Sequence, residues 1–183
     1  MPAKKIPASP LQFSRQFTND TVSPFNMFEY DYRTSAIKNP SGEIVFLMEN
    51  VEVPKQWSQI ATDILAQKYF RKAGVPQPDG STGRETSIKQ VAHRMAHCWR
   101  AWGERYNYFA TENDAQIFYD ELVYSILNQA CVPNSPQWFN TGLYEVYGIA
   151  GKPQGHYFVD PKSNLLQRST SAYERPQPHA CFI

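Results

Sequence analysis

The residue with the strongest chemical signal is a cysteine close to the last position of the chain. Cys181 follows His179 by two positions on a short apolar segment, and a proline-rich stretch precedes both residues. Residues i and i+2 of a β-strand face the same side. The imidazole could therefore lower the pKa of the Cys181 thiol and increase its reactivity. The alternative is a thiol that is simply packed at the start of a buried strand, and the residues by themselves leave both interpretations open.

Two histidines have the spacing of a metal site but lie on the wrong helical face for one. His93 and His97 are four residues apart in an expected helix, which can place two imidazoles on one metal ion. At about 100° per residue, both lie opposite the apolar stripe of that helix. Position 94 is arginine, not the glutamate of an HExxH motif. We therefore expect two solvent-facing histidines and no metal ligands.

The remaining chemical candidates favour packing over catalysis. Cys98 and Cys131 are expected to be buried, inert thiols, and no CxxC pair is present. Trp99 and Trp102 could stack nucleic-acid bases, but they belong to an apolar helical stripe and fit a core or an interface better. Residues 80–83 lack the GK[ST] ending of a phosphate-binding loop and do not follow an expected strand.

The composition describes a chain of one domain's size with little net charge. Its 183 residues include 18 basic and 17 acidic side chains, which leaves a formal net charge of +1. This balance argues against direct binding of nucleic acid or of an anionic membrane, and no run of about 18 apolar residues could span a bilayer. Three cysteines, an odd number, fit a reducing compartment. No apolar signal-peptide core begins the chain, so we expect a cytoplasmic protein.

Turn residues and hydrophobic periodicity predict a β-hairpin followed by helices. Residues 1–28 are rich in Ser, Thr, Asn and Pro, and we expect a flexible N-terminal arm there. Residues 30–38 and 43–48 are expected to be strands, joined by an Asn-Pro-Ser-Gly turn at 39–42. Apolar residues at spacings of three and four then predict three helices, over about 54–73, 86–106 and 111–132.

The expected helix boundaries rest on capping signals. Pro54 suits the first turn of a helix, and Thr111 with Asp114 three residues later resembles a capping box. Pro133 should end the third helix, because the residue before a proline is pushed out of the α region. The first helix carries its apolar residues as one stripe: Trp57, Ile60, Ala61, Ile64, Leu65 and Tyr69.

From Pro133 onward the sequence changes character. Loop-forming residues lie at 134–136 and 140–142, short strands are expected at 156–159 and 165–167, and residues 180–183 have the composition of a buried strand's beginning. The sequence therefore predicts three regions: an arm over 1–28, a hairpin and helical domain over 29–132, and a final region over 133–183.

Two stretches in the final region carry a specific resemblance to a known family. Residues 133–143, PNSPQWFNTGL, are similar to the substrate-loop motif of adenosylcobalamin-dependent (class II) ribonucleotide reductases. Residues 175–183, RPQPHACFI, resemble the segment that leads into the first strand of that family's catalytic barrel. Weaker similarities extend the resemblance over residues 27–183. The resemblance implies a mainly helical α+β domain that leads into the first strand of an incomplete ten-stranded α/β barrel.

The same resemblance implies roles for three residues. Cys181 would be one of two thiols that reduce the ribose 2′ position and form a disulfide in each turnover. Ser135 would help to hold the ribonucleotide in the substrate loop, and the main chain of Ala180 would contribute to the same pocket. Some relatives carry a serine where this chain has His179, so no side-chain contact is carried over to that position. Two thiols suit this chemistry because they can supply both protons and electrons.

The resemblance further implies that most of the catalytic machinery lies outside these 183 residues. We expect the N-terminal part of a thiyl-radical enzyme that makes deoxyribonucleotides for DNA synthesis, inactive without the remaining C-terminal part of the reductase. Adenosylcobalamin (vitamin B12) would be bound mainly by regions absent from this chain, and an external dithiol such as thioredoxin would restore the thiols. The competing hypothesis is a non-catalytic interaction module that binds a protein partner through Trp99, Trp102 and Tyr106.

Overall fold

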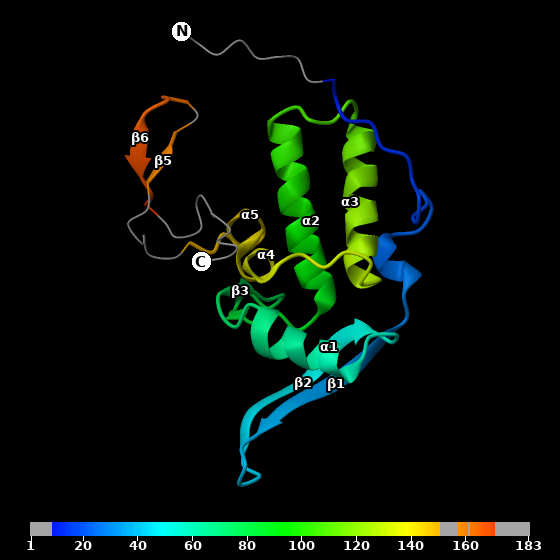
Figure 1. Ribbon diagram of the computed structural model, residues 1–183, viewed down its shortest axis with the longest axis vertical. Helices are drawn as coiled ribbons and strands as arrows, with labels where there is room; N and C mark the ends of the chain where they lie inside the picture. Colours follow the sequence, from blue (N-terminus) through cyan, green and yellow to red (C-terminus); the bar gives the residue numbers. More distant parts are fainter. Residues whose placement is uncertain (1–8, 151–156, 161, 171–183) are drawn as a thin grey trace.

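The computed structural model describes residues 9–150, 157–160 and 162–170, and it confirms the expected α+β class (Figure 1). Helices and two-stranded antiparallel sheets alternate along these residues. The expected first barrel strand, residues 180–183, lies outside them. In chain order the elements are η1 Pro24–Met27, β1 Tyr30–Lys38, β2 Ile44–Pro54, α1 Gln59–Ile64, η2 Leu65–Tyr69, β3 Val75–Pro76, β4 Thr82–Gly83, α2 Ile88–Arg105, α3 Glu112–Leu127, α4 Ser135–Asn140, α5 Leu143–Tyr147, β5 Tyr157–Val159 and β6 Leu166–Arg168.

Helices α2 and α3 lie side by side and form the centre of the molecule (Figure 1). Ser87 and Gln90 form a capping box at the start of α2, and Thr111 caps α3 as expected. The third helix was expected to reach Val132, but α3 ends at Leu127. The indole Nε1 of Trp57 donates a 2.7 Å hydrogen bond to the Leu127 carbonyl, so a distant side chain satisfies a carbonyl at the end of the helix.

The hairpin of β1 and β2 confirms the turn at residues 39–42, but its second strand is longer than expected. β2 continues to Pro54, which was expected to begin a helix. Val51 and Val53 are fully buried and pair with β1, so the extended backbone continues through this segment. The following helix, α1, begins instead at Gln59, where the Ser58 side chain accepts a hydrogen bond from the Ala61 amide.

The apolar stripe expected in the first helix is only partly buried. Ile60 and Ile64 are 71% and 46% exposed, whereas Leu65 is buried. The physical reason is that α1 spans only six residues and then widens into the π-helical turn η2. This turn changes the direction of the side chains that follow and brings Tyr69 over α4, where it stacks on Trp138.

The core fills the space between the hairpin, η2, α2 and α3, and α4 closes one side of it. Its buried members are Met48, Val51, Val53, Trp57, Leu65, Ala66, Phe70, Ile88, Val91, Ala92, Met95, Ala96, Val123, Ile126, Leu127 and Trp138. The apolar face of α2 that the sequence predicts is confirmed by the complete burial of Ile88, Val91 and Met95.

Residues 9–28, the described part of the expected arm, run along α3. Glu121 accepts hydrogen bonds from the Thr18 amide and hydroxyl, at 3.0 and 2.6 Å. Arg15 forms a 2.8 Å ion pair with Asp120, and the Phe13 ring packs against Phe118. These contacts give the segment a defined path, while the division of the chain at residues 28 and 132 stays a prediction.

The small hairpin of β5 and β6 confirms the short strands expected in the final region. Tyr157 pairs with Arg168 and Val159 with Leu166. Asp160 caps the connecting turn by accepting a hydrogen bond from the Ser163 amide at 2.9 Å.

Candidate functional site

Of the three residues to which the sequence assigns a site role, the structure describes one. Ser135 is exposed at the first position of α4, whereas Ala180 and Cys181, with the neighbouring His179, lie outside the described residues. The candidate site is therefore built from α4 and the segments that hold it. The roles of Ser135, Ala180 and Cys181 all stay predictions.

Ser135 is held by an aromatic neighbour from a distant part of the chain. Its Oγ lies 3.0 Å from the hydroxyl of Tyr69. The Tyr69 ring stacks on Trp138 with a centroid distance of 5.3 Å and also contacts Phe139. Tyr69 is the last residue of the π-helical turn, so the position of the serine depends on the end of η2.

The segment around Ser135 is a short helix between two turns. Loop-forming residues were expected on both sides, and the structure adds the six-residue helix α4 between them. Pro136 suits this place, because a proline in the first helical turn gives up no intrahelical hydrogen bond. The buried Trp138 donates its Nε1–H to the carbonyl of Pro133 at 2.7 Å, which closes the beginning of the segment on itself.

A fully buried ion pair anchors the other end of α4, and sequence analysis missed it. The Nε of Arg94 lies 2.7 Å from Oε1 of Glu85, and neither side chain is exposed. The Arg94 guanidinium also donates to the carbonyls of Trp138 and Thr141, at 2.6 and 2.7 Å. One signal in the sequence could have revealed the pair: Arg94 lies next to the apolar stripe of α2. An arginine buried there requires a charged or polar partner.

Glu85 also forms hydrogen bonds with two further segments of the chain. Its second oxygen accepts the backbone amide hydrogen of Arg71 at 2.7 Å, and Oε1 accepts the Tyr147 hydroxyl hydrogen at 2.9 Å. Burial, together with the nearby Glu85 carboxylate, raises the pKa of Tyr147, so this hydroxyl stays protonated as a donor. One carboxylate thus connects α2, α5 and the segment after η2.

The turn after α4 approaches α2 so closely that only glycine fits. Gly142 has φ +83°, and a Cβ atom at this position would overlap the backbone carbonyl of Arg94. Positive φ is accessible to glycine at little cost. The whole motif of residues 133–143 is therefore fixed at three places: the Trp138 indole, the Arg94 guanidinium and the glycine contact.

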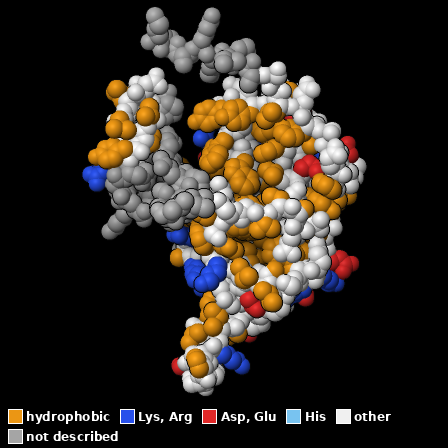
Figure 2. Space-filling view, viewed as in Figure 1, with side chains coloured by type: hydrophobic (Ala, Val, Ile, Leu, Met, Phe, Trp, Pro, Cys, Tyr) orange, Lys and Arg blue, Asp and Glu red, His pale blue; other side chains and the backbone are white. Residues whose placement is uncertain are grey.

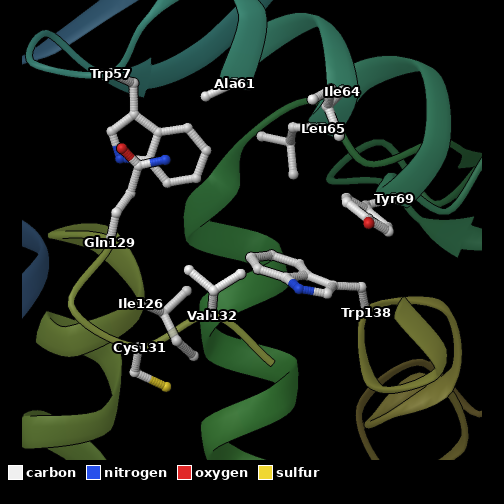
Figure 3. Close-up of a pocket in the computed structure, with 10 residues that line it drawn as sticks. All are labelled: Trp57, Ala61, Ile64, Leu65, Tyr69, Ile126, Gln129, Cys131, Val132 and Trp138. Carbon is white, nitrogen blue, oxygen red and sulfur yellow. The ribbon is translucent and has the colours of Figure 1, made fainter. Parts of the chain in front are cut away.

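An apolar cavity of about 280 Å³ is lined in part by Tyr69, the residue that contacts Ser135 (Figure 3). Trp57, just before α1, and the side chains of α1 and η2 form one wall, and those of α3, α4 and the segment between them form the other. The lining residues are Trp57, Ala61, Ile64, Leu65, Tyr69, Ile126, Gln129, Cys131, Val132 and Trp138. We call this cavity the apolar socket. None of its lining residues carries a formal charge.

The apolar socket does not fit a corrinoid cofactor. Its volume of about 280 Å³ is below the roughly 300–1,000 Å³ of pockets for drug-sized ligands, and a cobalamin is larger than such ligands. In the part of the chain that the structure describes, no group of three or more His, Cys, Asp or Glu residues could hold a metal ion. Within the same residues, no helix is both long and apolar enough to cross a membrane.

The histidines expected on the solvent-facing side of α2 are in fact half-buried. His93 Nδ1 lies 2.8 Å from the Tyr119 hydroxyl, and its ring is 5.3 Å from that of His97. The expectation was wrong because α3 packs against this side of α2 and covers it. Burial, with a smaller contribution from His97, lowers the pKa of His93.

Cys98, Cys131 and Trp99 of the helical domain pack at least partly against other side chains. Cys98 is buried, which confirms its expected burial, and burial raises the pKa of its thiol to about 11, which disfavours the reactive thiolate. Cys131, expected to be buried, is only half-buried, because α3 ends early and leaves it at the apolar socket. Trp99 packs against the core and is therefore not a free platform for bases.

Comparison with known proteins places this sequence in a family. A profile described as class II vitamin B12-dependent ribonucleotide reductase matches residues 31–129. Vitamin B12-dependent ribonucleotide reductases from Bradyrhizobium diazoefficiens and Agrobacterium fabrum are 47% and 45% identical to this chain over 94% of its length. The relative from Rhodopirellula baltica is 36% identical over the same share. The chain spans 16% of the length of these relatives and corresponds to their N-terminal region.

Proposed function

Because the chain belongs to the class II vitamin B12-dependent ribonucleotide reductases, we propose that it forms the N-terminal part of an enzyme that converts ribonucleotides to deoxyribonucleotides. In this proposal the 183 residues supply part of the substrate pocket and one of its reducing thiols. The radical chemistry and the cobalamin site belong to the polypeptide beyond residue 183. The chain spans only 16% of the length of its relatives, which supports this division.

Ser135 is the proposed substrate contact. Its hydroxyl is exposed, and its orientation is set by Tyr69 at 3.0 Å. A hydroxyl can donate to or accept from the oxygens of a ribonucleotide, and it need not change protonation to do so. The three anchors of the 133–143 motif support this role, because a pre-positioned group loses less conformational freedom when substrate binds.

Cys181 is the proposed electron donor, and the main chain of Ala180 is proposed to line the same pocket. In the net reaction the ribonucleotide loses its 2′-hydroxyl as water and gains a hydrogen in its place. Two thiols become a disulfide and supply the two protons and two electrons that this change needs. The second thiol comes from the remaining C-terminal part of the reductase. An external dithiol such as thioredoxin then reduces the disulfide, which fits a reducing compartment such as the cytoplasm.

The observation that carries the proposal is the exposed Ser135 hydroxyl on a segment that a buried ion pair holds in place. The test uses a fusion in which this chain replaces the corresponding N-terminal region of the Bradyrhizobium diazoefficiens relative. The fusion is given adenosylcobalamin, a dithiol and a ribonucleotide, and the product deoxyribonucleotide is measured. We expect multiple turnover by the fusion and none by the 183-residue chain alone.

Two substitutions in the fusion separate the proposed roles. Ser135→Ala should lower kcat/KM by about tenfold, the effect of losing one substrate hydrogen bond worth roughly 1–1.5 kcal/mol. Cys181→Ser should abolish multiple turnover. Ser41→Ala, in the exposed hairpin turn, is the control and should leave turnover unchanged. A folded but inactive fusion, or an active Cys181→Ser variant, would refute the proposal.

The competing module hypothesis makes the opposite prediction for these variants. A module that only binds a protein partner would tolerate Cys181→Ser without loss of function. The relatives that cover the chain are reductases, and Trp99 is packed against the core. We therefore favour the enzyme.

A further inference from the structure

The apolar socket opens on a surface that carries further apolar side chains. Ile64 and Val132 line it yet are 46% and 71% exposed, and Phe139, next to Tyr69, is 44% exposed. Figure 2 shows hydrophobic side chains gathered on this face, between the α1 and α4 regions of Figure 1. An apolar cavity that continues into an exposed apolar patch is typical of an interaction site.

We propose that the apolar socket is the docking site for an apolar segment of the polypeptide that follows residue 183 in the full-length reductase. The proposal rests on the proposed function, since it assumes that this chain acts as part of that longer enzyme. It goes further by assigning the surface on which the two parts meet. That surface is distinct from Ser135 itself, although the two share Tyr69 as a neighbour.

The length of the missing polypeptide supports this occupant over others. The chain spans 16% of the length of its relatives, so most of the enzyme is available to cover the face. The catalytic centre must bring its substrate to Ser135, and the socket begins at the tyrosine that contacts this serine. A second copy of this chain in the same place would supply no catalytic centre next to Ser135.

The chemistry of the lining defines what the segment must carry. With no formal charge among the lining residues, the socket offers nothing to neutralise a buried ion, and burying an unpaired charge is costly. An apolar cavity of about 150 Å³ is enough to hold a benzene molecule. The apolar socket, at about 280 Å³, therefore has room for one large or two medium-sized apolar side chains.

The test measures how fast the Cys131 thiol is alkylated, because this half-buried residue lines the socket. N-ethylmaleimide is added to the fusion and to the 183-residue chain, and the labelled peptide is quantified by mass spectrometry. The buried Cys98 reports whether each sample is folded. We expect Cys131 to react at least about tenfold more slowly in the fusion, which corresponds to about 1.4 kcal/mol of docking.

Matched valine substitutions in the fusion test whether this protection depends on the socket. Val132→Asp places a charge on the socket, whereas Val45→Asp changes a similarly exposed valine at the hairpin tip, 61% exposed compared with 71%. Val132→Asp should restore fast labelling and Val45→Asp should not. If Val132→Asp fails to fold, the milder Val132→Thr should give a smaller change in the same direction.

Three results would overturn the docking site. They are equal labelling rates in the fusion and the 183-residue chain, equal loss of protection in both aspartate variants, and slow labelling of the 183-residue chain that speeds up on dilution. The last result would assign the socket to a second copy. Turnover by the fusion is scored separately: an active fusion with exposed Cys131 refutes the docking site alone, and an inactive fusion with protected Cys131 refutes the proposed function alone.

Discussion

Substitution of Arg94 by methionine is expected to unfold or severely destabilise the protein. The side chain is fully buried, pairs with Glu85 at 2.7 Å and donates to the carbonyls of Trp138 and Thr141. Methionine keeps much of the volume but leaves Glu85 as an uncompensated buried charge and the two carbonyls without their donor. Removing one partner of a buried pair costs about 3–5 kcal/mol, a large part of a typical total stability of about 5–15 kcal/mol.

The measurement is urea unfolding followed by tryptophan fluorescence, since Trp138 lies on the anchored segment. Arg100→Met is the control, because it breaks the partly exposed i,i+4 pair with Glu104 on the same helix and should cost at most about 1 kcal/mol. The double variant Arg94→Met/Glu85→Gln should recover part of the loss, because it removes the unpaired charge as well. A loss for Arg94→Met no larger than that for Arg100→Met would refute the view that this pair holds α4.

Three further predictions concern other anchors of the fold. Gly142→Ala should destabilise the protein by several kcal/mol in urea unfolding, because its Cβ would overlap backbone; Gly148→Ala, also at positive φ but in open space, should cost only the roughly 1–2 kcal/mol of a left-handed residue. Glu121→Ala should release residues 9–28 from α3, seen as faster proteolysis within that segment, because it removes the acceptor of both Thr18 hydrogen bonds; unchanged cleavage would contradict this. Burial lowers the pKa of His93, so the unfolded state binds a proton more readily than the folded state. Stability should therefore fall as pH drops below the unfolded pKa of about 6.5. His93→Gln should reduce that loss of stability between about pH 7 and 5, and an unchanged pH profile of stability would contradict this prediction.

The elements that sequence analysis predicted correctly are those that local signals determine. The turn at residues 39–42 contains its own Pro and Gly, and Ser87 and Thr111 cap α2 and α3 with their own side chains. The 133–143 motif could likewise be recognised from its amino-acid sequence alone. In each case the information lies within a few residues of the feature.

The features that sequence analysis missed depend on partners far along the chain. α3 ends at Leu127 where Trp57, 70 residues away, supplies a hydrogen bond, and no local signal marks that contact. Arg94 is buried because Glu85 and two carbonyls of another segment meet it. His93 is half-buried because α3 covers it, which a helical wheel of α2 alone does not include. Tertiary packing decided each of these outcomes.

Because η2 is a wide π-helical turn, the number of residues that it contains sets the direction in which the Tyr69 side chain points. A π-turn holds one residue more than the α-turn it replaces. Deleting one residue between Leu65 and Tyr69 would restore a regular helix but rotate everything after it by about 100°. Tyr69 would then leave Trp138, and the serine 66 positions further on would lose its neighbour. A single-residue deletion at this place would therefore displace the neighbours of the 133–143 motif, although it changes no residue of that motif.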